Sequence, residues 1–120
     1  MSLLGMPRRI PAVRQVYVMP SRCYDPSDTA WHPILVVSVD PVVRMAMIVT
    51  RTTKPYAKGP GAIVHPAQPG LGLPLPGWWR MAYPKPVIYS AFDEPDVEHR
   101  GELDEATWEK VVQQLEGGVG

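Results

Sequence analysis

WHPILVVSVDPVVRMAMIVTRTTK, residues 31–54, decides the fold because it holds two apolar runs separated by a turn. Residues 34–39 are almost entirely apolar, which is typical of a strand buried on both faces. Asp40 and Pro41 end that run, and residues 44–50 form the second one. We therefore expect an antiparallel hairpin. The second run ends abruptly on a cluster of hydroxyls and cations, Thr50-Arg51-Thr52-Thr53-Lys54.

Further short strands are expected on both sides of this hairpin. Apolar and aromatic segments bounded by Gly, Pro and Asp predict strands at 13–18, 62–65, 78–83 and 87–92. Gly and Pro are too frequent over residues 59–77 for a helix or a central strand, so we expect a long surface loop there.

The C-terminus carries the pattern of an amphipathic helix. Asp104 is a good N-cap, and apolar residues recur after it at helical spacing: Trp108, Val111, Val112 and Leu115. We predict a helix at 104–116. Short strands followed by one helix predict a mainly β fold, a small barrel with a helix packed on it. We assign residues 1–12 to an N-terminal arm and 13–120 to one domain.

Composition narrows the class of protein. With 120 residues, 45% of them hydrophobic, the chain can bury a core as one domain. Its apolar stretches are far shorter than a membrane span, so we expect a cytoplasmic protein. Cys23 is the only cysteine, which excludes an internal disulfide and a cysteine-rich metal site. We predict no metal and no cofactor.

The formal net charge is zero, but two segments of the chain carry opposite net charges. Residues 1–90 carry ten Lys or Arg against three Asp, a balance of +7. Residues 91–120 carry two cations against nine acids, a balance of −7. This asymmetry suggests a body that binds a polyanion. The alternative is that the acidic segment packs back and neutralises the body.

Three motifs resemble those of the MazF/PemK family of toxin endoribonucleases. They are the second strand at 33–38, the Thr-rich end of the third strand at 48–53, and the Gly-x-Leu and acidic helix start at 101–107. Their order and spacing match over roughly residues 13–116. The resemblance implies an SH3-like barrel with helices, and metal-independent cleavage of single-stranded RNA. It also implies a homodimer and an antitoxin partner.

The candidate catalytic residues are His32 and Thr50. The family has an Arg before the Pro of its second strand, whereas this chain has His32; Thr50 occupies the matching Thr position. An imidazole can take or give a proton near neutral pH, which RNA cleavage requires. The alternatives are that His32 is a solvated loop residue and that Thr50 only satisfies a turn backbone.

Other residues are candidates for binding RNA. Arg51 and Lys54 adjoin Thr50 and are suited to holding a phosphate. The remaining candidates are Arg22, Thr52, His65 and Trp79. In Trp78-Trp79, strand alternation sends the two rings to opposite faces, so at most one belongs to the core. Cations on a solvated face and aromatic rings in a core are the structural alternatives.

Two functions follow from these residues. The first is a toxin that cleaves single-stranded RNA, active as a dimer and neutralised by an antitoxin. The second is a MazF-like fold that has lost cleavage, as His32 in place of Arg suggests, and that acts by binding a protein or nucleic acid. A plasmid or phage genome suits either function.

Overall fold

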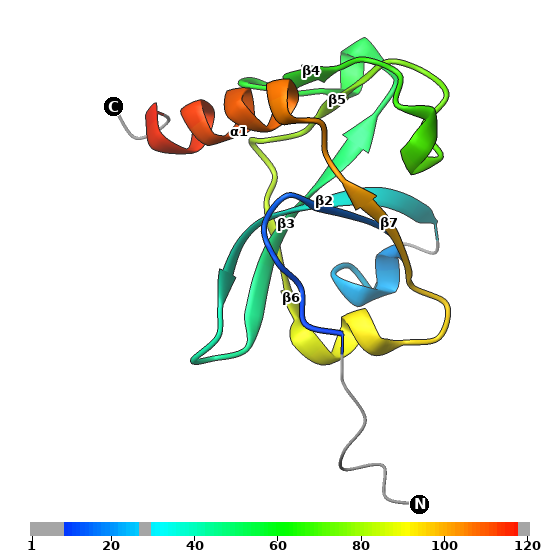
Figure 1. Ribbon diagram of the computed structural model, residues 1–120, viewed down its shortest axis with the longest axis vertical. Coiled ribbons are helices and arrows are strands. Elements are labelled where there is room, and N and C mark those ends of the chain that lie inside the picture. The colour runs from blue at the N-terminus through cyan, green and yellow to red at the C-terminus, as the bar shows by residue number, and fades with distance from the viewer. Residues whose placement is uncertain (1–8, 27–29, 118–120) are drawn as a thin grey trace, which may run out of the picture.

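The computed structural model describes residues 9–26 and 30–117, so residues 1–8 of the predicted arm lie outside the described residues. Seven strands form one curled, half-barrel sheet, and a helix, α1, lies beside one end of it (Figure 1). The strands are β1 (Gln15–Pro20), β2 (Trp31–Asp40), β3 (Met45–Thr52), β4 (Ile63–His65), β5 (Gly77–Trp79), β6 (Lys85–Ile88) and β7 (Glu98–Glu102). The predicted mainly β fold with a C-terminal helix is confirmed.

The sheet is built around the predicted hairpin. Its order is β4-β5-β3-β2-β1-β7, and β6 also pairs with β3. β2 and β3 are antiparallel, in a register that sets Ile34 opposite Thr50 and Asp40 opposite Met45. β1 and β7 complete one side of the sheet through antiparallel pairing.

The middle of β2, residues 34–37, is entirely apolar because both faces of the strand are covered there. Ile34 and Val36 point into one buried cluster, with Tyr17 and Phe92. The next residues along, Leu35 and Val37, point into the other cluster. Further members of that second cluster are Val16, Val49, Leu71, Leu73, Trp79, Leu103 and Val111. Side chains alternate across a strand, so a strand between two cores cannot carry polar residues on either face.

Helix α1 (Glu105–Gly117) covers the second cluster and contacts β4. The Asp104 carboxylate accepts hydrogen bonds from the Thr107 backbone N–H at 2.9 Å and from the Thr107 hydroxyl at 2.8 Å, which confirms the predicted N-cap. Leu103 is fully buried before the helix, and Val111 anchors its inner face. In the described part of the chain, no helix has the length and apolar character needed to cross a membrane.

Three strand predictions differ from the structure. The predicted strand at 87–92 is only half right: β6 ends at Ile88, and Tyr89–Asp93 form a 3-10 helix whose aromatic rings reach the first cluster. The predicted strand at 78–83 ends at Trp79. β7 was not predicted, because it is an edge strand of charged residues without apolar alternation.

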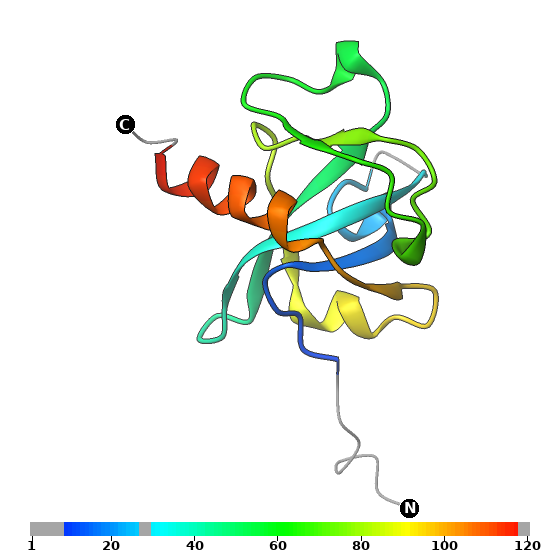
Figure 2. The same cartoon turned by 45° about the horizontal axis from the view of Figure 1, so that its top comes forward.

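The expected loop at 59–77 contains regular pieces. Besides β4, it holds a 3-10 helix, Pro69–Leu71, and a bridge between Gln68 and Leu73. Leu71 and Leu73 are buried in the second cluster, so this part of the loop is pinned to the sheet. Figure 2 shows the green segments that follow β3 standing at the top of the molecule, above the sheet.

A matched pair of leucines tests the packing of α1. Leu103 is fully buried, whereas Leu115 on α1 is 43% exposed. Leu103→Ala is expected to lower the free energy of unfolding by about 2–5 kcal/mol, because it removes buried methyl groups and leaves a cavity. Leu115→Ala should change it by only about 0.5 kcal/mol. Urea denaturation followed by circular dichroism measures both; equal losses would mean that Leu103 does not anchor the helix.

Candidate functional site

A hollow opens beside the end of β3, where the pairing of β3 with β2 stops. β2 and β3 are paired up to Ile34 and Thr50. Beyond that point Arg51 and Thr52 pair only with β5, opposite Trp79 and Trp78, while the start of β2 runs on against β1 as far as Trp31. The two strands therefore separate, and the space between them is not filled by backbone.

Five of the sequence-predicted site residues line this hollow. Its volume is about 510 Å³, and its walls include His32, Thr50, Arg51, Thr52 and Lys54. Two basic residues that were not predicted, Arg80 and Lys85, also line it. The hollow thus brings an imidazole from the start of β2 together with a hydroxyl from the end of β3 and the cations Lys54, Arg80 and Lys85.

Arg80 is hydrogen-bonded to Thr50 through both its backbone and its side chain. Its backbone N–H donates to the Thr50 carbonyl at 2.9 Å, which continues the β5 pairing beyond Trp79. Its side chain makes a long hydrogen bond, 3.5 Å, from Nη1 to Thr50 Oγ1. Nε donates to the Ala57 carbonyl at 2.8 Å, and the guanidinium lies 4.6 Å from the centroid of the Tyr83 ring. Packing on both sides therefore orients this cation toward Thr50.

The hollow is electropositive. Lys54, Arg80 and Lys85 line it, and Asp25 is the one acidic side chain among its lining residues. Within the described residues, none of these three cations forms an ion pair with an acidic side chain. The acidic residues of the C-terminal segment, residues 91–117, therefore do not neutralise these cations. Cations concentrated in a concave site attract phosphate groups.

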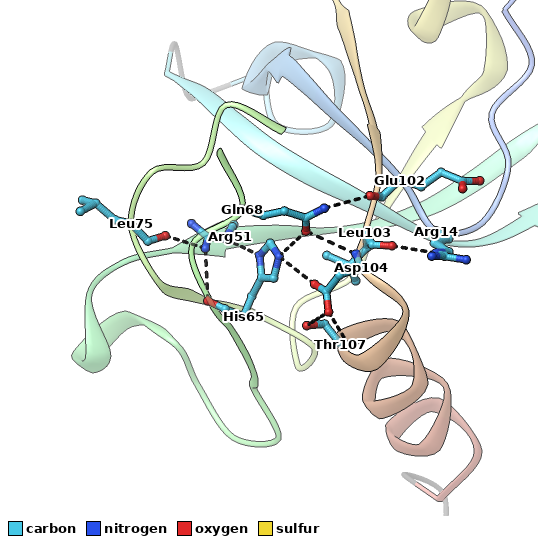
Figure 3. A network of polar contacts seen from close by, with 9 residues as sticks. All are labelled: Arg14, Arg51, His65, Gln68, Leu75, Glu102, Leu103, Asp104 and Thr107. Carbon is cyan, nitrogen blue, oxygen red and sulfur yellow. Dashed lines mark hydrogen bonds and ion pairs between the residues drawn. The ribbon is translucent and has the colours of Figure 1, made fainter. Parts of the chain in front are cut away.

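Arg51, a predicted phosphate ligand, is buried instead (Figure 3). It adjoins the hollow, but its guanidinium is committed to the opposite side of β3. Nη2 donates to the Leu75 carbonyl at 2.8 Å and to the His65 carbonyl at 3.3 Å. Nε donates to Nδ1 of His65 at 3.0 Å. Strand alternation explains the correction: residues 50 and 51 face opposite ways.

His65, a predicted RNA contact, is fully buried in the same network. Because Nδ1 accepts the Arg51 hydrogen bond, the imidazole is neutral with its proton on Nε2. Nε2 lies 2.8 Å from Gln68 Oε1 and 3.2 Å from Asp104 Oδ1. Asp104 in turn caps α1, so the network links β3, the 65–75 loop and the helix. His65 is a structural residue here and not a ligand of RNA.

Trp78 and Trp79 lie on opposite faces, as strand alternation requires. However, Trp79, which we predicted as an RNA contact, is the one in the core. Trp79 is fully buried in the second cluster, with the Arg51 guanidinium 6.0 Å from its ring centroid. It is not available to RNA. Trp78 is on the other face, only partly buried, and opposite Thr52 in register. The prediction that at most one of the two rings belongs to the core is therefore right, and the prediction that Trp79 contacts RNA is wrong.

Arg22 is held by the acidic segment that follows β6. Its Nη2 lies 2.7 Å from Asp96 Oδ2 and 3.2 Å from Glu94 Oε1, so its charge is already paired. Within the described residues, Arg22 is the one sequence-predicted cation that forms an ion pair with the acidic C-terminal segment. Cys23 beside it donates to Glu94 at 3.3 Å. Burial and that carboxylate raise the pKa of the Cys23 thiol to about 12, which leaves it unreactive.

The fold matches that of MazF. A MazE–MazF crystal structure from Deinococcus radiodurans superposes with a TM-score of 0.65 at 15% identity, over 93% of this chain and 97% of that one. A MazF crystal structure from the same organism gives a TM-score of 0.64 at 18% identity, over 93% and 98% of the two chains. No family model matches the sequence, and no curated protein matches it. The MazF-like fold expected from the resemblance is confirmed.

The buried imidazole predicts how stability depends on pH. Burial, reinforced by the Arg51 charge, lowers the pKa of His65 below its ordinary value, although Gln68 and Asp104 oppose the shift. In the unfolded chain the His65 imidazole therefore binds a proton near pH 6.5, whereas in the folded chain it binds one only at lower pH. The stability that His65 contributes is complete above about pH 6.5 and is lost as the pH falls through the lowered pKa, by up to about 1.4 kcal/mol per pH unit.

Urea denaturation between pH 7.5 and 5.5 measures this loss. His65→Gln, which keeps an acceptor for Arg51 and a donor for Gln68, is expected to flatten the slope. His99→Gln is the control, because His99 is exposed. If the wild type and His65→Gln lose stability in parallel over this range, the neutral imidazole is not the cause.

Proposed function

We propose that this chain is a MazF-like toxin that cleaves single-stranded RNA in the hollow between β2 and β3. The observation that carries the proposal is the convergence of His32, Thr50 and Arg80 on one basic hollow. The MazF-like fold supports it, because two of the three motifs that resemble the toxin family, residues 33–38 and 48–53, lie on β2 and β3, which form this hollow.

The reaction assigned to the hollow is an internal transfer at phosphorus. The ribose 2′-oxygen forms a bond to the phosphorus as its proton leaves to a base. The bond from phosphorus to the 5′-oxygen breaks, and that oxygen takes a proton from an acid. The products are a 2′,3′-cyclic phosphate and a 5′-hydroxyl. Such a step needs a base, an acid and groups that stabilise negative charge on the phosphate oxygens.

The side chains of the hollow divide these roles. His32 is suited to take the 2′-proton, because the unprotonated nitrogen of a neutral imidazole can accept it. Arg80, already aimed at Thr50, is suited to bind a phosphate oxygen together with the Thr50 hydroxyl. The ammonium groups of Lys54 and Lys85 supply further positive charge, and either can give the proton to the leaving oxygen.

Arg80 can also replace the family Arg, whose absence is the main argument against an active nuclease. The resemblance implies an Arg before the Pro of the second strand, and His32 stands there instead. In this chain a guanidinium reaches the Thr50 hydroxyl from β5. We propose that the cation required at the phosphate comes from this different strand, while the start of β2 provides the imidazole.

Protein partners form part of the proposal. One of the solved structures with this fold is a MazE–MazF complex. It supports the proposal that a second protein, of the antitoxin type that the resemblance implies, binds this chain. We also propose a homodimer. Light scattering on the purified protein tests the dimer directly, and a monomer at micromolar concentration would contradict it.

The second candidate function is a MazF-like module that binds RNA or protein without cutting. It is favoured by His32 in place of Arg, and by the hydrogen bond that ties Arg80 to the Ala57 carbonyl. The two functions differ in one outcome. A module without catalysis keeps its growth inhibition or partner binding when the Thr50 hydroxyl is removed, whereas a nuclease does not.

Cleavage of a long single-stranded RNA, in buffer containing EDTA, tests the nuclease. Thr50→Val and Arg80→Gln each remove one group that stabilises the phosphate, so each is expected to slow cleavage about 10²- to 10³-fold. His32→Ala should slow it at least about tenfold, because it removes the proposed base. Lys110→Gln on the exposed face of α1 is the control and should cleave normally.

Circular dichroism must show that each variant is folded. RNA that stays intact after long incubation with folded wild-type protein would eliminate the nuclease and leave the binding module. Normal cleavage by both Thr50→Val and Arg80→Gln would place the active site elsewhere.

A further inference from the structure

The face of the sheet that carries the hollow continues beyond it. Thr50 and Thr52 lie on the same side of β3, because they are two residues apart. Trp78 is opposite Thr52 in register, and Arg80 follows it on the same side. Val64 on β4 is opposite Trp78 and is 50% exposed. The row from Thr52 through Trp78 to Val64 is therefore an open extension of the face on which Thr50 and Arg80 meet.

Trp78 is the large aromatic residue of this extension, and a cation rests on it. The Lys58 ammonium lies 5.4 Å from the centroid of the Trp78 ring. Lys58 belongs to the β3–β4 loop, the same loop that places Lys54 and Ala57 in the wall of the hollow. The opposite neighbour, Trp79, is sealed in the core, so the β5 backbone under Trp78 is fixed from behind.

We propose that Trp78 is a stacking platform for one unpaired base of single-stranded RNA, flanking the phosphate held at Thr50 and Arg80, and that Lys58 binds the neighbouring phosphate. This subsite rests on the proposed function. A base stacked on an aromatic ring gains more than an exposed lysine does in the same place. The base can therefore displace Lys58, whose ammonium then turns to the phosphate that arrives with it.

The chemistry of this face favours a nucleic acid over an apolar protein segment. Lys54, Lys58, Arg80 and Lys85 surround the path from Trp78 into the hollow. An aromatic ring set among cations, next to a basic hollow, is the combination by which single strands are bound without base pairing. Because every base has a flat face, this subsite sets affinity and position along the strand more than sequence.

Binding to an RNA that cannot be cut separates this inference from the nuclease. The probe is a mixed-sequence, fully 2′-O-methylated 12-nucleotide RNA, which lacks the attacking hydroxyl. Trp78→Ala is expected to weaken its binding about 5- to 100-fold. Trp78→Phe, which keeps a ring on a folded strand, should recover most of that loss. Trp31→Ala, a change at another exposed tryptophan, is the matched control.

Two further readouts identify stacking and the phosphate contact. Tryptophan fluorescence should be quenched by the probe in the wild type and in Trp31→Phe, and the quenching should be lost in Trp78→Phe. Lys58→Gln should reduce the dependence of the dissociation constant on salt by about one ion, while Lys110→Gln should not.

The outcomes distinguish the two proposals. Loss of affinity in Trp78→Ala with recovery in Trp78→Phe supports the subsite even if the wild type never cuts RNA. Unchanged affinity in Trp78→Ala overturns the subsite even if the wild type is an active nuclease. A wild type that binds no probe at low salt, or whose fluorescence the probe does not change, also overturns it.

Discussion

The pairing of β3 with β2 ends at Thr50, and the hollow depends on that end. Up to Thr50, β3 is paired with β2 along one edge, and up to Ile48 with β6 along the other; from Arg51 onward it is paired only with β5. This last pairing needs a close approach at the start of β5. A Cβ on Gly77 would lie 2.6 Å from the Thr52 carbonyl oxygen, so only glycine fits there. Without this contact β5 would stand away from β3, and Arg80 would not reach the Thr50 hydroxyl.

The network around His65 holds the same region from the other side of the sheet. Arg51 is a buried cation, and its cost is offset because its donors reach the His65 ring and two backbone carbonyls. Through Asp104 the network also fixes the first turn of α1. Residues at the end of β3 thus alternate between its two faces. Thr50 and Thr52 face the hollow, while Arg51 holds the strand through hydrogen bonds on the opposite face.

This alternation between the two faces explains why several residues that we predicted as RNA contacts are structural. Arg51, His65 and Trp79 all lie on the inner face, where they contact one another, with the His65 and Trp79 ring centroids 5.7 Å apart. Arg22 is engaged by Glu94 and Asp96. Four other cations, Lys54, Lys58, Arg80 and Lys85, lie at the hollow and on the neighbouring Trp78. Together they make this face of the described residues basic.

The amino-acid sequence determined the hairpin, the helix and its cap, because these depend on local patterns: two apolar runs around Asp40-Pro41, and Asp104 before a helical repeat. It also determined that the start of β2 and the end of β3 would lie near each other, since a hairpin requires it. It did not determine which strand follows at the far edge of β3. The pairing of Thr52 with Trp78 joins residues 26 positions apart across a Gly- and Pro-rich loop, and no local signal specifies such a register. Only the tertiary structure therefore decided that Arg80 belongs to the site, that Trp79 is core and Trp78 is not, and that Arg51 turns inward.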